Sequence, residues 1–275
     1  MALGLAGCAF GPSKEEVTQQ AETNARAQIA MRMWKERCET KAGYKIYRRA
    51  DNVDDIFLMK IRDGDINFDD QYKLDDPYGR DSRGDNYILN FLKGAYHQRT
   101  DQSYPAGSPP RAGFKFVEAF DPKDGVRYRY TASKKAVRQM NLNHPNVQRL
   151  LKENPSMDIN VYEFVLDKVP AKGTRPRYGV TYDDISTREE RDYWIAGSSL
   201  RVIDLETNEV MAERTGYMVD WAQGSRAGFR SPWLFAADHA CPGFQWNPNF
   251  PVRNASGAQI SQTLIFVEQV LTPSK

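Results

Sequence analysis

A stripe of apolar residues near every fourth position marks the first element of the chain. Such residues share one face of a helix, and they are Val17, Ala21, Ala25, Ile29 and Met33, widened by Trp34 and Cys38. Ser13 and Glu16 form a capping box that predicts the start of the helix, and Gly43 is typical of its end. We therefore expect a helix over residues 14–41, with a polar first part that stands free as a stalk and a second part that packs on the core.

Alternation of polar side chains with β-branched and aromatic ones predicts strands in most of the remaining chain. The expected strands cover residues 44–48, 56–62, 114–120, 126–131, 159–169, 193–204, 210–219 and 262–270. Shorter segments are expected to be helical, at residues 87–94, 133–139 and 146–152. The polar segment 205–209 predicts a hairpin turn. Because the strands follow one another without crossover helices, the sequence predicts an α+β fold, a mostly antiparallel sheet with the long N-terminal helix packed on it.

Length and composition favour one domain without a dedicated nucleic-acid surface. The chain has 275 residues, of which 40% are hydrophobic, and it shows no internal repeat, so one core can serve it. Its net charge of +2 comes from 38 basic and 36 acidic residues, without the excess of a nucleic-acid binder. No run of 18 apolar residues predicts a transmembrane helix. Phosphate-loop, dinucleotide and serine-hydrolase motifs are absent from the sequence, and we expect no cofactor.

The run Leu5-Ala6-Gly7-Cys8 resembles the lipobox of bacterial lipoproteins. In that family the preceding peptide is cleaved and the cysteine becomes the lipidated first residue. Family signals have a basic start and a longer apolar stretch, so we expect the natural start to lie upstream. The resemblance implies that residues 1–12 hold a residual signal peptide, the lipidation site and a linker, and that residues 13–275 form the domain. Acylated Cys8 would join the chain to membrane lipid, and Ala9 favours the outer membrane, facing the periplasm.

If Cys8 carries lipid, only Cys38 and Cys241 remain of the three cysteines. Two is the number that a disulfide needs, and the periplasm is oxidising. We therefore expect a Cys38–Cys241 bridge, with two separate buried thiols as the alternative.

Two short segments carry candidate chemistry of other kinds. Residues Asp63, Asp65, Asn67 and Asp69 have the spacing of a calcium loop, although the glycine and glutamate of such loops are replaced by Phe68 and Leu74. The alternative for this loop, residues 63–70, is a solvated acidic turn.

Residues Asp238, His239 and Cys241 bring an imidazole within two residues of a thiol, which a thiol enzyme or hydrolase would need. The expected disulfide would consume that thiol. A zinc site formed with Cys38 is conceivable, but no paired ligand spacing supports it.

Aromatic rings gather between residues 217 and 250, among interspersed glycine and proline. Rings on a shaped loop can bind partner proteins or glycans, and the candidate surface contains Trp221, Phe229, Trp233, Phe235, Phe244 and Trp246. The alternative is an irregular flap that covers the sheet and is held by Cys241.

These observations favour a non-enzymatic envelope lipoprotein that binds another envelope component, a protein or a glycan, or serves in an envelope assembly. The alternatives are an envelope thiol enzyme or hydrolase that uses Cys241, and a calcium-dependent binding module that uses residues 63–70.

Overall fold

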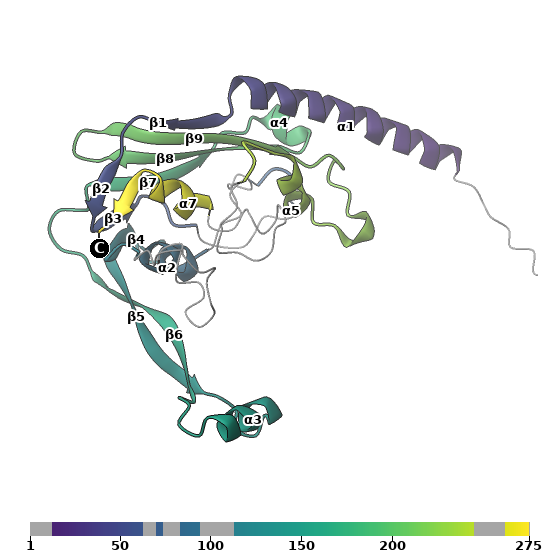
Figure 1. Ribbon diagram of the computed structural model, residues 1–275. Helices are drawn as coiled ribbons and strands as arrows, with labels where there is room; N and C mark the ends of the chain where they lie inside the picture. The colour runs from purple at the N-terminus through teal and green to yellow at the C-terminus, as the bar shows by residue number, and fades with distance from the viewer. Residues whose placement is uncertain (1–12, 63–69, 74–82, 94–112, 245–261, 275) are drawn as a thin grey trace, which may run out of the picture.

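The computed structural model describes residues 13–62, 70–73, 83–93, 113–244 and 262–274 (Figure 1). Its main body is a nine-stranded sheet. The strands of this sheet are β1 (Gly43–Ile46), β3 (Asp55–Leu58), β4 (Phe116–Phe120), β5 (Arg127–Gln139), β6 (Asn160–Pro170), β7 (Tyr178–Asp184), β8 (Ile195–Asp204), β9 (Glu209–Val219) and β10 (Ala240–Cys241). Their spatial order is β1-β9-β8-β7-β3-β4-β5-β6, and β10 also pairs with β9. A small parallel sheet joins β2 (Ala50–Val53) to β11 (Leu271–Pro273).

The expected α+β fold with a mostly antiparallel sheet is confirmed, with a parallel centre as the one difference in the main sheet. Strand β3 runs parallel to both of its neighbours, β4 and β7, whereas the other pairs are antiparallel. Parallel neighbours need a long connection, and the chain between β3 and β4 contains helix α2 (Asp85–Lys93).

The long N-terminal helix α1 (Lys14–Thr40) agrees with the predicted range and with its predicted division into two parts. In its second part Ala30 is buried against Ile195 and Tyr217 of the sheet, and Met33 and Trp34 pack on the same cluster. In its first part the described side chains up to residue 22 are exposed. Figure 1 shows this part of the helix continuing beyond the edge of the sheet.

The core lies on the face of the sheet opposite α1. There, β-strand residues such as Val117, Leu200 and Val202 meet Phe91 of α2 and Phe266 of α7 (Gln262–Glu268). Figure 1 shows α2 and α7 together on this side.

Two expected elements were wrong in type. The run 262–270 was expected to be a strand, but it forms α7 before the short β11. Leu264, Phe266 and Val267 are all buried, and a short apolar run buried all round has no period that separates a helix from a strand.

Residues 133–139 were expected to be helical because Ala, Lys, Arg and Gln favour helices. Pairing with β6 overrides that preference, and these residues complete β5. The helices expected at 87–94 and 146–152 are confirmed as α2 and α3 (Pro145–Glu153).

Candidate binding surfaces

The predicted disulfide is present. The sulfur atoms of Cys38 and Cys241 are bonded at 1.99 Å, with 5.6 Å between the Cα atoms. The bridge joins the last turns of α1 to β10, so it holds the helix on β9, which pairs with β10. Cys241 is therefore not a free thiol, and the thiol mechanism built on it has no nucleophile in this structure.

Asp238 and His239, the neighbours of Cys241, do not point to a catalytic group. Asp238 is exposed, and the His239 ring meets Trp34 of α1 edge to face, with 6.0 Å between the centroids. With both sulfur atoms in the bridge, the zinc set of Cys38, Cys241 and His239 is wrong as well. The described part of the chain contains no cluster of three or more metal-ligating His, Cys, Asp or Glu side chains.

The candidate calcium ligands Asp63, Asp65, Asn67 and Asp69 lie outside the described residues. Asp70, which ends this loop, accepts backbone N–H bonds from Tyr72 and Lys73 at 2.9 and 3.1 Å. The calcium site stays a prediction. Calorimetry with calcium that shows neither heat nor a change in melting temperature would remove it.

The six aromatic residues of the candidate surface do not form one patch. Trp233 is buried beside Trp194, with 5.0 Å between the centroids, and donates its indole N–H to the Asp70 carbonyl at 2.9 Å. Phe244 is half-buried on the same cluster. Trp246 lies outside the described residues. Trp221, Phe229 and Phe235 are exposed.

Two of the three exposed rings, Trp221 and Phe229, belong to residues 220–230, here called the Phe229 loop, and Phe235 lies in the helix that follows. The side chains of this loop hold it in place. Asp220 is fully buried at the end of β9, and its carboxylate accepts bonds from the Arg230 guanidinium and from the Gly224 N–H, the latter at 2.9 Å. The same guanidinium lies 5.6 Å from the Trp221 ring and 5.2 Å from the Phe235 ring. A buried charge pair of this kind fixes the loop because separating it would leave a charge unpaired.

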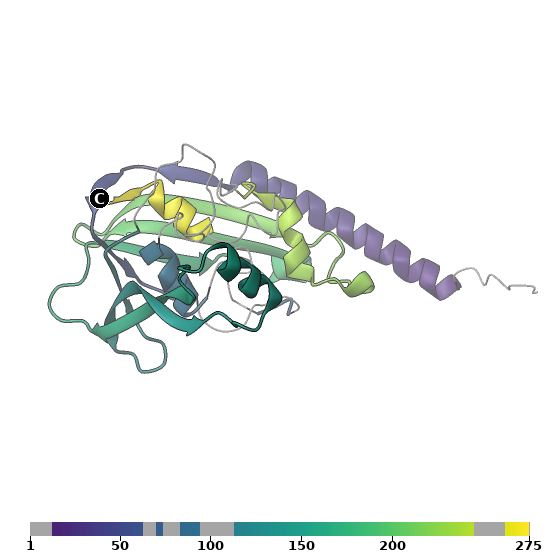
Figure 2. The same cartoon turned by 60° about the horizontal axis from the view of Figure 1, so that its bottom comes forward.

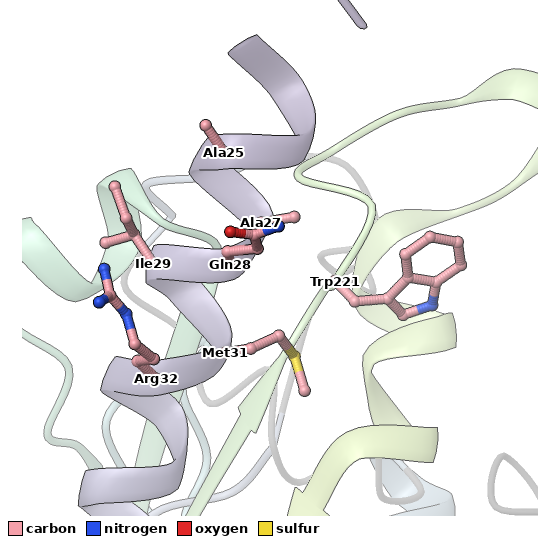
Figure 3. Close-up of a pocket in the computed structure, with 7 residues that line it drawn as sticks. All are labelled: Ala25, Ala27, Gln28, Ile29, Met31, Arg32 and Trp221. Atoms are coloured by element: carbon pink, nitrogen blue, oxygen red, sulfur yellow. The ribbon is translucent and has the colours of Figure 1, made fainter. Parts of the chain in front are cut away.

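A shallow hollow of about 660 Å³ lies along α1 beside Trp221. Figure 3 shows Met31 extending from the helix toward the segment that carries Trp221, whereas Ile29 and Arg32 lie on the other side of the helix. The lining side chains do not converge, and they include no carboxylate, imidazole, thiol, hydroxyl or amine, with Arg32 as the one charged group. This hollow is an open surface beside the Phe229 loop and not an enclosed ligand site.

The most prominent feature is a projecting arm formed by residues 131–167, a projection that no local pattern in the sequence predicts. Strand β4 pairs with β5 only as far as Tyr130, but β6 continues to pair with β5 up to Gln139. Figure 1 shows these two strands leaving the sheet as a ribbon with α3 at its far end, and in Figure 2, where the bottom of Figure 1 is turned forward, α3 lies in front of the body. At the rise of a strand, residues 131–139 extend about 30 Å.

Side chains on the arm are poorly covered. From Thr131 to Gln139 no described side chain is buried, and α3 has no buried residue. Val147, Leu150 and Leu151 have helical spacing along α3, so they form one apolar stripe. Large apolar side chains elsewhere on the arm are also exposed, and they are Val137, Leu142 and Tyr162.

The arm carries a basic stretch on β5. Residues 133–152 contain five Lys and Arg, whereas Glu153, Asp158, Glu163 and Asp167 follow, and Glu153 pairs with Arg149 on α3 at 3.4 Å. Lys135 makes an ion pair with Asp167 across the ribbon at 2.8 Å, and this contact lowers the pKa of that carboxyl. A signal for this surface was present in the sequence, since a basic stretch precedes an amphipathic helix, but those features became a surface only through their projection from the sheet.

Comparison of the chain with protein-family models, with curated proteins and with solved structures found no match. Among the described helices, none is long and apolar enough to cross a bilayer.

Proposed function

We propose that this protein is a non-enzymatic envelope lipoprotein, anchored through acylated Cys8, that binds an acidic protein of the envelope with its projecting arm. The lipobox-like run Leu5-Ala6-Gly7-Cys8 supports the anchor. The Cys38–Cys241 bridge supports an oxidising compartment, where such bonds persist. The exposed first part of α1 suits a stalk between the lipid and the domain.

The observation that carries the binding proposal is an arm whose terminal helix has no fully buried side chain, since Leu150 is exposed and Val147 and Leu151 are half-buried. A two-stranded ribbon alone is marginally stable in water, so its length adds little to the stability of the domain. An amphipathic helix with three apolar side chains in register suits a groove on a partner. We therefore assign the arm to recognition, with Val147, Leu150 and Leu151 of α3 as the apolar anchors.

The basic residues of β5 favour an acidic partner. Lys134, Lys135 and Arg138 lie close together on this strand, and clustered positive charge speeds the encounter with an acidic surface. Arg149 and Lys152 lie on α3 itself, on the face opposite the apolar stripe, and Arg149 pairs with Glu153 at 3.4 Å. Binding of this kind weakens as salt is raised, because exposed charges are screened.

Photocrosslinking tests the arm directly in cells that export and acylate the protein. A photoreactive residue in place of Leu150 is expected to give one discrete protein adduct, and the double variant Arg149→Glu, Lys152→Glu is expected to lose it. The matched control is a photoreactive residue in place of Val210, on β9, which has nearly the same exposure, 37% against 39%. Equal labelling from both positions would contradict the proposal.

A shortened arm gives a second test that does not depend on one side chain. Lys134 and Phe164 face each other in the ribbon, so an Asn-Gly turn can replace residues 135–163. This variant is expected to fold and to lose the adduct partner. Intact mass of the membrane-extracted protein tests the anchor separately, because acylation of Cys8 and oxidation of the other two cysteines both change the mass.

A further inference from the structure

Phe229 is held fully outside the protein. Its side chain is 102% exposed, more than any other large apolar residue among those described. The residue lies in the short 3₁₀ turn η2 (Ala227–Phe229) with φ of 62°, a conformation that non-glycine residues rarely adopt. A large apolar ring that is displayed in this way adds no buried surface to the fold, and this favours a contact outside the protein.

Specific contacts fix the conformation of the loop that displays this ring. Gly224 has φ of 79°, and a Cβ atom there would lie 2.2 Å from the Trp194 ring, so only glycine fits. The carboxylate of Asp220 binds both this glycine and Arg230, as described above. These contacts fix both sides of the turn that carries Phe229.

The position of the loop relates it to the N-terminal anchor. Arg26 of α1 donates to the Gln223 side chain at 3.2 Å, which places the loop beside the middle of the helix. From there to Lys14 the helix rises about 18 Å, and the six residue steps back to Cys8 reach at most about 22 Å more. Figures 1 and 2 both show the segment between β9 and α5 (Pro232–Ala236) on the same side of the domain as the free end of α1.

We propose that the Phe229 loop rests in the headgroup interface of the membrane that holds acylated Cys8, as a second, weak membrane contact. This proposal rests on the lipid anchor of the proposed function and is independent of the arm. Aromatic rings favour the bilayer interface, and basic side chains favour its anionic lipids. The loop offers both, because exposed Arg226 precedes the Ala227-Gly228-Phe229 turn.

A lipid surface suits this loop better than a protein partner does. Phe229 is flanked by Ala227 and Gly228, so the turn presents one ring and little further apolar area. Stable protein interfaces bury about 800 Å² on each partner. A membrane contact needs far less, because the acyl chains already hold the loop near the bilayer at high effective concentration.

Quenching by brominated lipid tests the contact in the acylated, full-length protein. Two reporter variants, Phe229→Trp and Phe120→Trp, are each reconstituted in vesicles of phosphatidylethanolamine and phosphatidylglycerol, with and without brominated phosphatidylcholine. Phe120 ends β4 and is 53% exposed, so its variant is an exposed control away from the loop. Quenching is measured as the change relative to the wild type, whose five tryptophans provide the background.

The expected result is a blue-shifted, bromolipid-quenched signal from Phe229→Trp and an unquenched signal from Phe120→Trp. Equal quenching of the two reporters in protein with the acylated mass would overturn the loop contact and leave the lipid anchor intact. A mass without acyl chains would instead refute the proposed function. Unchanged melting temperatures of both variants ensure that neither signal comes from unfolding. A protein adduct from a photoreactive residue at position 229 would assign the loop to a partner and also overturn the proposal.

Discussion

Two antiparallel ribbons of similar length, β8–β9 and β5–β6, have opposite surroundings. The β8–β9 pair runs from Ile195 opposite Val219 to Asp204 opposite Glu209, with one irregularity between Val202 and Ile203, and most of its side chains are buried. The outer part of β5–β6 pairs just as regularly from Thr131 to Gln139, with one irregularity near Ala136. None of its described β5 side chains is buried there.

The difference comes from what covers each ribbon. The β8–β9 pair lies between β1 and β7, with α1 on one face and the core helices on the other. Beyond Tyr130 the described residues give β5–β6 no third strand. Both ribbons therefore have hydrogen-bonded pairing, but only β8–β9 is buried, and burial supplies most of the stability. We expect changes in β8–β9 to alter folding and changes in the arm to alter binding.

The largest effect is expected from loss of the disulfide that holds α1 on the covered ribbon. Cys38 and Cys241 are 203 residues apart, and closing a loop of that length is worth at most about 5 kcal/mol. Reduction, or the Cys38→Ser, Cys241→Ser variant, should lower the free energy of unfolding by about 3 to 4 kcal/mol in denaturant titrations. The arm-shortened protein should lose the same amount. A smaller loss there would show that the arm and the body are coupled.

A matched pair of leucine truncations compares the ribbons themselves. Leu200 of β8 is fully buried, so Leu200→Ala should destabilise the protein by about 3 kcal/mol through lost burial and a cavity. Leu150 of α3 is exposed, so Leu150→Ala should change stability by less than about 0.5 kcal/mol. Equilibrium unfolding of both variants checks this, and comparable losses would mean that α3 packs on the body in solution.

Acid should weaken the covered ribbon at its hairpin end. Asp204 is buried at the end of β8 and accepts bonds from Arg177, at 2.8 Å and 3.1 Å, and from Arg48. These bonds, from Arg177 foremost, hold the pKa of Asp204 well below its usual range. Its stabilisation is therefore complete above the unfolded pKa of about 4 and is lost as the pH falls below that value.

The matching variants separate this buried carboxyl from an exposed one on the arm. Asp204→Asn should lose about 2 kcal/mol at neutral pH, because two half-exposed arginines lose the charge of the buried carboxylate that they contact. The difference from the wild type should shrink as the pH falls below about 4. On the arm, Asp167 also has a lowered pKa, caused by Lys135, but both side chains are half-exposed. Asp167→Asn should leave the unfolding midpoint unchanged at any pH.

The smallest effect on stability is expected from removal of the arm itself. Replacing residues 135–163 by a two-residue turn should leave the melting temperature within error of the wild type. Hydrogen exchange refines this expectation, because arm amides should exchange rapidly in the intact protein while β8–β9 amides exchange only on global unfolding. Strong protection of residues 131–139 in the isolated protein would show that something covers the arm without its partner.

Local patterns in the sequence determined a good part of this protein. The capping box at Ser13 and the stripe from Val17 to Met33 predicted α1 within one residue at its C-terminal end. The β-rich runs around residues 205–209 predicted the β8–β9 hairpin. Counting cysteines, once Cys8 was set aside, predicted the Cys38–Cys241 bridge. The helix and the hairpin depend on residues that are neighbours in the sequence, and the bridge depends on the number of cysteines. A single sequence contains both kinds of information.

Only the tertiary structure decided which predicted features are buried and which are displayed. It buried Trp233 and exposed Phe229, although both belong to the same aromatic segment, because burial depends on neighbours such as Trp194 that are distant in sequence. It made residues 133–139 a strand, since pairing with β6 outweighs helix propensity. It also carried a basic, helix-ended segment away from the sheet, and no local pattern records that projection, because it arises where β4 stops and β6 continues.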